Sequence, residues 1–375
     1  MLTPLLSTQE LSVFPASFDQ ARQALLAEVK QLDKLPGTAW THRSLTYEGE
    51  GPAGERLSTE QIWVGEPDAS RVLVLQSAVH GVEGHCGSAI QADLLRRLNR
   101  GRVQLPAGLA VLMIHAINPW GFAWSRRVDE QGIDVNRNFV DFERPLPVNP
   151  GYAQLAQDVL PVSGGLAAGE QALQAYLQEH GQRQYELALS GGQYQFEEGL
   201  FYGGRGKSQA RLNLEAIINE LDCGNRQVAL LDLHTGLGPY GHGELICDHP
   251  IGSQGMLTAQ RWFGDAATLP EAGDSCSVPK QGLVDYAWHE VMGKNSCYLT
   301  LEFGTYPLAE LLRCLREDHL IRKPGQQPFT HPQSDVVRQQ LLRQFYPAEV
   351  QWQTLVLLRA RQAIQLACAG LFNDC

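Results

Sequence analysis

Two residues that can bind a metal ion, His80 and Glu83, stand three positions apart just after an apolar run. That run, residues 72–75 (Val-Leu-Val-Leu), is typical of a buried strand, and Gly81 and Gly84 allow the chain to turn sharply behind it. We therefore expect an imidazole and a carboxylate at the carboxyl edge of a sheet, where open α/β sheets bind ligands. The pattern predicts two of the three protein ligands of a metal site. A hydrogen-bonded pair that caps the next helix is the alternative.

His234 is the natural third ligand, because it ends a second buried run, residues 228–233 (Val-Ala-Leu-Leu-Asp-Leu). Two histidines and one glutamate with an open fourth position are typical of catalytic zinc, whereas structural zinc sites are closed and rich in cysteine. Asp232 lies on the same strand face and can orient the imidazole. Taken alone, His234 would be interpreted as a neutral core histidine. The same ligands also suit other divalent ions.

Glu302 stands at the end of a third apolar run, residues 297–301 (Cys-Tyr-Leu-Thr-Leu). A carboxylate in this position is costly unless it is paired or catalytic. Beside a metal-activated water it can accept the water proton and then donate it to a leaving amine. The alternative is an ion pair with a structural arginine.

A polar loop between residues 124 and 139 concentrates arginine and asparagine side chains. Guanidinium groups bind carboxylates through two parallel hydrogen bonds, and asparagine adds a neutral donor. A solvated loop is the alternative, but such a loop would not need the apolar residues Ile133 and Phe139. The composition therefore predicts a substrate clamp. Its candidate residues are Arg126, Arg127, Asn136, Arg137 and Asn138.

The elements that must position these residues follow from the apolar pattern. Continuous apolar runs at 72–75 and 110–114, separated by a predicted helix at about 88–98, indicate a parallel sheet covered on both faces. We predict one α/β domain over residues 1–375, with a core at about 38–320. A helical insert is expected at about 141–226, and a helical tail at about 321–375.

In order along the chain, these motifs resemble the carboxypeptidase A-like zinc metallopeptidase superfamily over about residues 71–306. The most specific of them is Asp134–Phe139 (DVNRNF), which follows an Asn-Pro-x-Gly motif at Asn118. The resemblance implies a mixed, mostly parallel eight-stranded sheet between helices. It also implies one zinc ion per chain, with His80, Glu83 and His234 as its ligands.

The resemblance further assigns a role to each remaining candidate. Glu302 matches the general base and acid, and Asn136 and Arg137 match the pair that grips a terminal carboxylate. Arg127 matches the arginine that polarises the scissile carbonyl. Arg126 is the adjacent alternative.

Zinc-dependent hydrolysis of an amide bond next to a free carboxylate is the implied activity, with a small peptide as substrate in a carboxypeptidase-type cleavage. The sequence Asp232-Leu-His-Thr is closer to the acylase branch, so a deacylase of small N-acyl amino acids is the second hypothesis. A zinc-holding binding module without catalysis is the third. Residues 282–286 resemble the segment that lines the family's specificity pocket, where Asp285 would favour a basic group. The family's capping tyrosine has no plain match, and Tyr240, Tyr286 and Tyr306 are candidates.

The overall composition limits the kinds of partner that the protein is expected to bind. The 375 residues carry 30 Lys and Arg against 41 Asp and Glu, and this net charge of −11 argues against nucleic acid or an anionic membrane as partner. The first residues lack the pattern of a signal peptide, and no run approaches the ~20 apolar residues of a membrane span. Eight scattered cysteines then predict reduced thiols and a cytoplasmic location.

Overall fold

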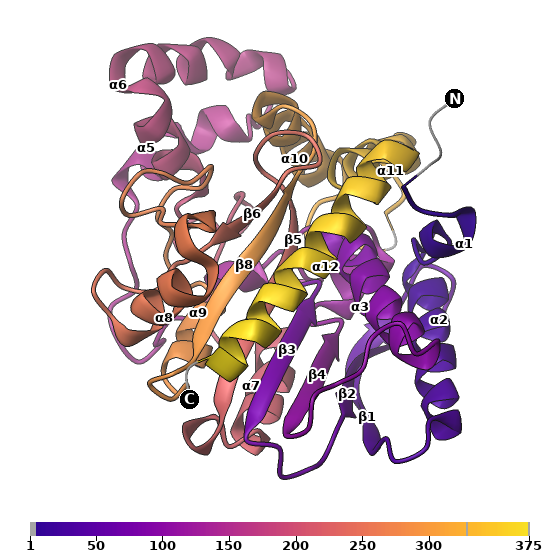
Figure 1. Cartoon of the computed structure of the whole chain (residues 1–375). Coiled ribbons are helices and arrows are strands. Elements are labelled where there is room, and N and C mark those ends of the chain that lie inside the picture. The colour runs from indigo at the N-terminus through magenta and orange to yellow at the C-terminus, as the bar shows by residue number, and fades with distance from the viewer. Residues whose placement is uncertain (1–4, 328, 374–375) are drawn as a thin grey trace.

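The computed structural model describes residues 5–327 and 329–373 (Figure 1). Its centre is an eight-stranded sheet in the order β1-β2-β4-β3-β5-β8-β6-β7. The pairs β3·β4, β3·β5, β5·β8 and β6·β7 are parallel and the others antiparallel, which confirms the predicted mixed sheet. The strands are β1 (Trp40–Glu50), β2 (Arg56–Val64), β3 (Arg71–Ser77), β4 (Leu109–His115), β5 (Gln227–Gly236), β6 (Gly243–Ile246), β7 (Ala267–Thr268) and β8 (Cys297–Gly304).

Helices cover both faces of this sheet, as the continuous apolar strands require. On one face α2, α3, α8 and α12 pack against side chains such as Leu231, whereas α7 and α9 pack on the other face against side chains such as Leu230. Successive residues of a strand therefore point to opposite faces of the sheet and pack into different apolar cores. The helices are α1 (Thr8–Leu11), α2 (Phe18–Gln31), α3 (Gly84–Asn99), α4 (Pro119–Ala123), α5 (Pro150–Val159), α6 (Glu170–Ser190), α7 (Gln209–Glu220), α8 (Gln254–Phe263), α9 (Asp285–His289), α10 (Leu308–Ile321), α11 (Ser334–Phe345) and α12 (Val350–Asn373).

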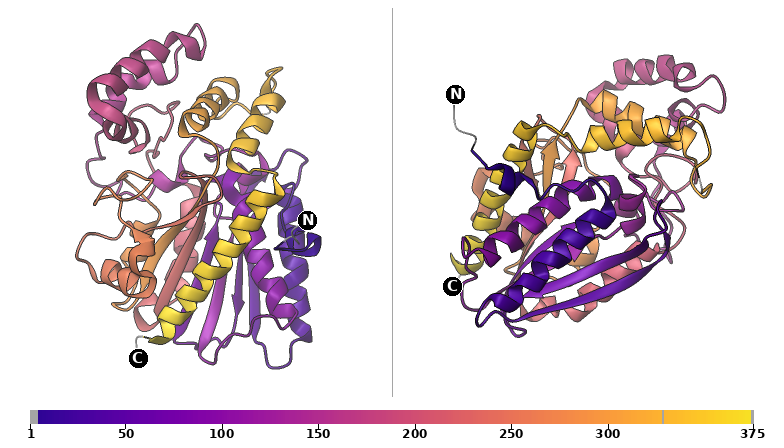
Figure 2. Two further views of the ribbon diagram at one scale, coloured as in Figure 1. Left: turned by 45° about the horizontal axis from the view of Figure 1, so that its top comes forward. Right: turned by 90° about the vertical axis from the view of Figure 1, so that its right-hand side faces the viewer.

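A third apolar cluster lies away from both faces. It joins α5 and α6 of the predicted insert to α10, which precedes the predicted tail, and to α11 of the tail, through residues such as Leu155, Leu315 and Leu341. Figures 1 and 2 show these four helices gathered at one end of the sheet. The predicted insert thus divides into two parts: α5 and α6 lie at the sheet end, and α7 covers a sheet face.

The C-terminal helix α12 lies across the sheet (Figure 1). By length and composition it is the one helix in the described ranges that could cross a membrane. Its buried residues, among them Trp352, Val356, Ala360 and Ala363, recur at helical spacing and join the core beneath the sheet. Packing against the sheet therefore accounts for the apolar composition of this helix.

The central strand β5 should dominate the stability of the fold. Replacing the buried Leu231 by alanine leaves a cavity between the sheet and α3, so we expect a loss of about 2–5 kcal/mol in the free energy of unfolding. The matched change Leu257→Ala, at a side chain that is 42% exposed, should cost under about 0.5 kcal/mol. Urea denaturation of both variants measures the difference. Equal losses would contradict this packing.

Candidate active site

The ends of two neighbouring parallel strands bring the three predicted metal ligands together. Strand β3 ends at Ser77, just before His80, and pairs in register with β5, which carries His234. Glu83 lies on a short 3-10 turn, Gly81–Glu83. The turn needs its glycine, because a Cβ at Gly81 would lie 2.0 Å from the carbonyl carbon of Gly121. One ligand atom from each of His80, Glu83 and His234 lies within 4.8 Å of the others.

Both histidines turn the same ring nitrogen inward. Nδ1 of His80 lies 2.9 Å from Glu83 Oε1, and Nδ1 of His234 lies 3.1 Å from Glu83 Oε2. The outer Nε2 atoms contact carboxylates: that of His80 lies 3.1 Å from Asp134 Oδ1, and that of His234 lies 2.7 Å from Asp232 Oδ2. Carboxylates on the outer nitrogen are the usual support of metal-binding histidines.

The donor set fits a divalent cation such as zinc. His80 Nδ1 is buried and has no hydrogen-bond partner in the described part of the chain, despite its closeness to Glu83. Burial raises the pKa of Glu83, but His80 and His234 lower it more, so its pKa lies well below the ordinary value and the group is charged. Burial alone would lower the pKa of His234, but Asp232 and then Glu83 raise it by more. The pKa of His234 therefore lies well above its ordinary value. Two imidazoles and one carboxylate around a shared point match a catalytic zinc site.

Asp134 ties the arginine-bearing loop to this centre. Its buried carboxylate contacts His80, accepts a hydrogen bond from Arg127 Nε (3.0 Å) and accepts another from the backbone N–H of Asn136 (3.0 Å). Burial raises its pKa, but Arg127 and then His80 lower it well below the ordinary value. This role of Asp134 was not predicted from the sequence, although the residue begins the most specific motif.

Glu302 lies directly opposite His234 in the pairing of β5 with β8. It is buried, lines the same pocket and accepts a hydrogen bond from the backbone N–H of Leu237 (2.9 Å). Burial, and then the negative charge of Glu83, raise the pKa of Glu302 to about 7. A carboxyl group with this pKa can both accept and donate a proton near neutral pH.

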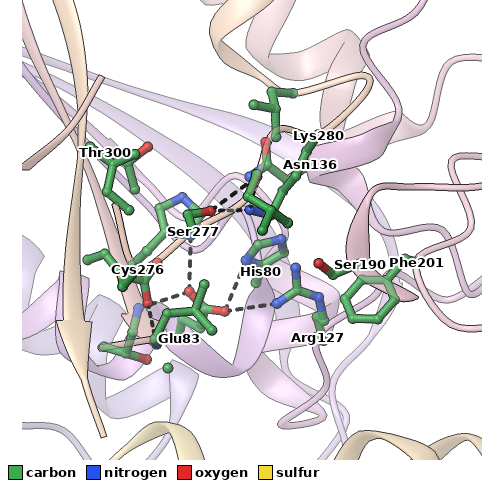
Figure 3. Close-up of a pocket in the computed structure, with 18 of the residues that line it drawn as sticks. His80, Glu83, Arg127, Asn136, Ser190, Phe201, Cys276, Ser277, Lys280 and Thr300 are labelled. Atoms are coloured by element: carbon green, nitrogen blue, oxygen red, sulfur yellow. Dashed lines mark hydrogen bonds and ion pairs between the residues drawn. The ribbon is translucent and has the colours of Figure 1, made fainter. Parts of the chain in front are cut away.

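The two adjacent arginines point to different places. Arg127 lines the pocket, where its Nη1 lies 3.3 Å from Glu83 Oε1 and its guanidinium stacks over Phe201 (Figure 3). The prediction that Arg126 contacts substrate is corrected by the structure. Its fully buried side chain pairs instead with Asp318 at 2.8 Å, away from the pocket.

Asn136 and Arg137 both line the pocket, as predicted for a clamp. Asn136 Oδ1 accepts a hydrogen bond from the backbone N–H of Val284 (2.9 Å), so its amide N–H groups are left for another partner. Arg137 donates to the backbone oxygens of Asn136 (2.6 Å) and Ser190 (2.9 Å). These contacts fix its guanidinium in the pocket wall and leave further N–H groups uncommitted.

The pocket lining also includes three ionisable residues, Asp285, Asp248 and Lys280, and we call this set the charged side pocket. Asp285 is buried, and its carboxyl oxygens have no hydrogen-bond partner among the described residues. Burial, and then Asp248, raise the pKa of Asp285 well above its ordinary value. Lys280 donates to the backbone oxygen of Val278 (2.8 Å), and burial and Arg137 lower its pKa to about 8. No local pattern in the sequence singles out Asp248 or Lys280.

The candidate capping tyrosines lie outside this pocket. Tyr240 and Tyr306 contact Glu349 at the surface, and Tyr286 donates to the backbone oxygen of Lys280 (3.2 Å). Tyr298 does line the pocket, but its hydroxyl donates to Asp232 (2.5 Å) beside His234.

The pocket is lined by both polar and apolar side chains. Its walls come from the insert, the tail and the segment 276–285 as well as from the strand ends. Residues close together in space but far apart in sequence thus surround the ligand group.

We predict that Asp134→Asn weakens zinc binding by about 10- to 100-fold, because it removes a carboxylate that orients a ligand imidazole. His80→Ala should abolish binding, and His180→Ala, on the outside of α6, should leave it unchanged. Competition with a chelator of known affinity measures each constant. Unchanged affinity in Asp134→Asn would contradict its orienting role.

The chain is similar to one family model and to several solved structures. A family model described as "Protein of unknown function (DUF2817)" matches residues 14–359, and no curated protein matches. Among solved structures, carboxypeptidase A from Helicoverpa armigera is 14% identical, over 94% of this chain and 73% of that one, with a TM-score of 0.43. Thrombin activatable fibrinolysis inhibitor is 9% identical, over 98% and 80%, with a TM-score of 0.47.

Succinylglutamate desuccinylase from Chromobacterium violaceum is 16% identical, over 89% of this chain and 75% of that one, with a TM-score of 0.36. The chain is thus similar to carboxypeptidases and to a desuccinylase, the kinds of protein that its motifs resemble. Because the family model matches most of the sequence, the protein belongs to the family described as "Protein of unknown function (DUF2817)".

Proposed function

We propose that the protein is a zinc-dependent hydrolase that cleaves an amide bond next to a free carboxylate in a small substrate. One observation carries the proposal: the His80, Glu83 and His234 group shares its pocket with the buried Glu302 and with the donors of Arg127, Asn136 and Arg137. When bound, a zinc ion supplies Lewis-acid polarisation of a carbonyl and lowers the pKa of water toward about 7.

Glu302 is assigned to the proton transfers. It accepts a proton from the water whose oxygen attacks the carbonyl carbon, and it returns that proton to the nitrogen as the carbon–nitrogen bond breaks. The products are a carboxylate and an amine. Its pKa of about 7 suits both transfers.

Arg127 is assigned to the oxygen of the scissile carbonyl. Its guanidinium lies within 3.3 Å of a ligand carboxylate and is held by Asp134, so its position is fixed before substrate arrives. Donors of this kind are worth about 10²–10³ in rate. Asn136 and Arg137 are assigned to the substrate carboxylate, which fixes the distance from that carboxylate to the reacting carbon.

The surrounding walls favour a small substrate. Glu186 and Ser190 from α6, Leu311 from α10 and Phe345 from α11 all line the pocket. A carboxypeptidase-type cleavage of a short peptide is our lead, and deacylation of an N-acyl amino acid is the second candidate, favoured by the same enclosure. The combination of Glu302 and Arg127 argues against a binding module without catalysis.

Replacing Glu302 by glutamine should leave zinc binding intact and abolish turnover, because the amide has no carboxylate to accept the proton. A panel of dipeptides and N-acyl amino acids measures kcat, and metal analysis measures zinc content. Glu220→Gln, a surface change on α7, serves as the matched control. Hydrolysis at the parental rate by Glu302→Gln would refute the assigned base.

Asp285 is proposed to meet a basic or amine-bearing side chain of the substrate. Its buried carboxyl group has no hydrogen-bond partner among the described residues and lies 3.7 Å from His289 Nε2, so an incoming amine would complete a charged hydrogen bond. Asp285→Asn should lower kcat/KM for substrates ending in lysine by about tenfold or more, while those ending in alanine change little. An equal loss for both would remove Asp285 from the specificity pocket.

A further inference from the structure

The pocket has a second, apolar side whose role the proposed function leaves open. Its lining residues come from three helices of the insert and the tail: Leu189 of α6, Leu308, Leu311, Leu312 and Leu315 of α10, and Phe345 of α11. We call this set the leucine wall. We infer, on the basis of the proposed function, that the leucine wall binds the acyl side of the scissile amide and selects an apolar acyl group.

The wall lies against the strand that carries a metal ligand. A Cβ built on Gly236, two residues after His234, would lie 3.0 Å from Leu311 Cδ1 and 3.1 Å from Phe345 Cε1. Thr235 donates a hydrogen bond to the backbone oxygen of Phe345 (2.8 Å). An acyl group whose carbonyl reaches the metal centre therefore meets aliphatic and aromatic side chains next.

The carboxylate clamp is built from different neighbours. Asn136 is bonded to Val284, and the backbone oxygen of Arg137 accepts a hydrogen bond from Tyr194. Segment 276–285 also supplies the charged side pocket with Lys280 and Asp285. Helix α6 contributes to both linings, since Ser190 holds Arg137 and Leu189 belongs to the leucine wall. The leucines of α10 and Phe345 of α11 make no part of the clamp. A substrate with a charged amine-side residue and an apolar acyl side matches both.

Helix α10 presents its leucines as one stripe. Leu308, Leu311, Leu312 and Leu315 follow the i, i+3, i+4, i+7 spacing of a single helix face. Leu311 and Leu315 are buried within the cluster of insert and tail, whereas Leu308 and Leu312 are only half-buried and keep surface for a ligand. Glu186, the carboxylate of α6 in this pocket, is bonded to Gln182 (2.6 Å).

The test is a series of substrates that differ only in the acyl group. Nα-acetyl-, Nα-hexanoyl- and Nα-decanoyl-L-lysine are titrated calorimetrically into zinc-loaded Glu302→Gln, and their hydrolysis by the parent protein is followed in parallel. Affinity and kcat/KM should rise by roughly three- to fourfold for each added methylene until the wall is filled. The dipeptides Leu-Lys and Ser-Lys form a second arm, which tells a hydrophobic penultimate residue from a fatty acyl chain.

Leu312→Gln, at a half-buried position, should flatten the chain-length dependence, and Leu308→Gln provides a second variant if the first folds poorly. Leu257→Gln, on α8 outside the pocket, is the matched control. A flat or inverted chain-length dependence, with measurable hydrolysis, would overturn the inference and leave the proposed function standing. Failure to bind or cleave any member of either arm would overturn the proposed function itself.

Discussion

Two buried carboxylates hold the candidate metal centre in shape. Asp134 contacts the outer nitrogen of His80, and Asp232 contacts that of His234, so each imidazole turns its Nδ1 toward Glu83. Without them both rings could rotate, and Glu83 would lose two of the groups that keep it charged in a buried place. Asp134 also holds Arg127, so one carboxylate couples the metal ligands to the group assigned to the substrate carbonyl.

The sheet makes this arrangement possible. Strands β3, β5 and β8 are parallel neighbours, so their carboxyl ends meet at one edge, and His234 stands directly opposite Glu302. The same edge is where the insert and tail helices gather, in a core of their own (Figure 2). The sheet thus positions the candidate catalytic side chains, and the added helices determine which molecules can reach them.

Prediction from sequence succeeded where the pattern is local. The apolar strands that precede His80 or carry His234 and Glu302 were visible as runs, and α11 lies within the predicted helical tail. The local sequence alone does not distinguish the role of Arg126 from that of Arg127. Only the packing of α10 shows that Arg126 forms an ion pair with Asp318. The three tyrosine candidates lie outside the pocket lining, which no local pattern shows. Lys280 and Asp248 reach the pocket through contacts between distant segments, which no local periodicity encodes. The leucine spacing of α10 is a local pattern, but its place in this pocket depends on the tertiary structure.

The central claim is that one divalent ion is held by two Nδ1 atoms and one carboxylate. A crystal structure of the zinc-loaded protein tests it most directly. Zinc should be bound by Nδ1 of His80, Nδ1 of His234 and a carboxylate oxygen of Glu83, with Asp134 and Asp232 still on the Nε2 atoms and Glu302 facing the open position. Zinc bound through either Nε2 atom, or at a different set of residues, would contradict it.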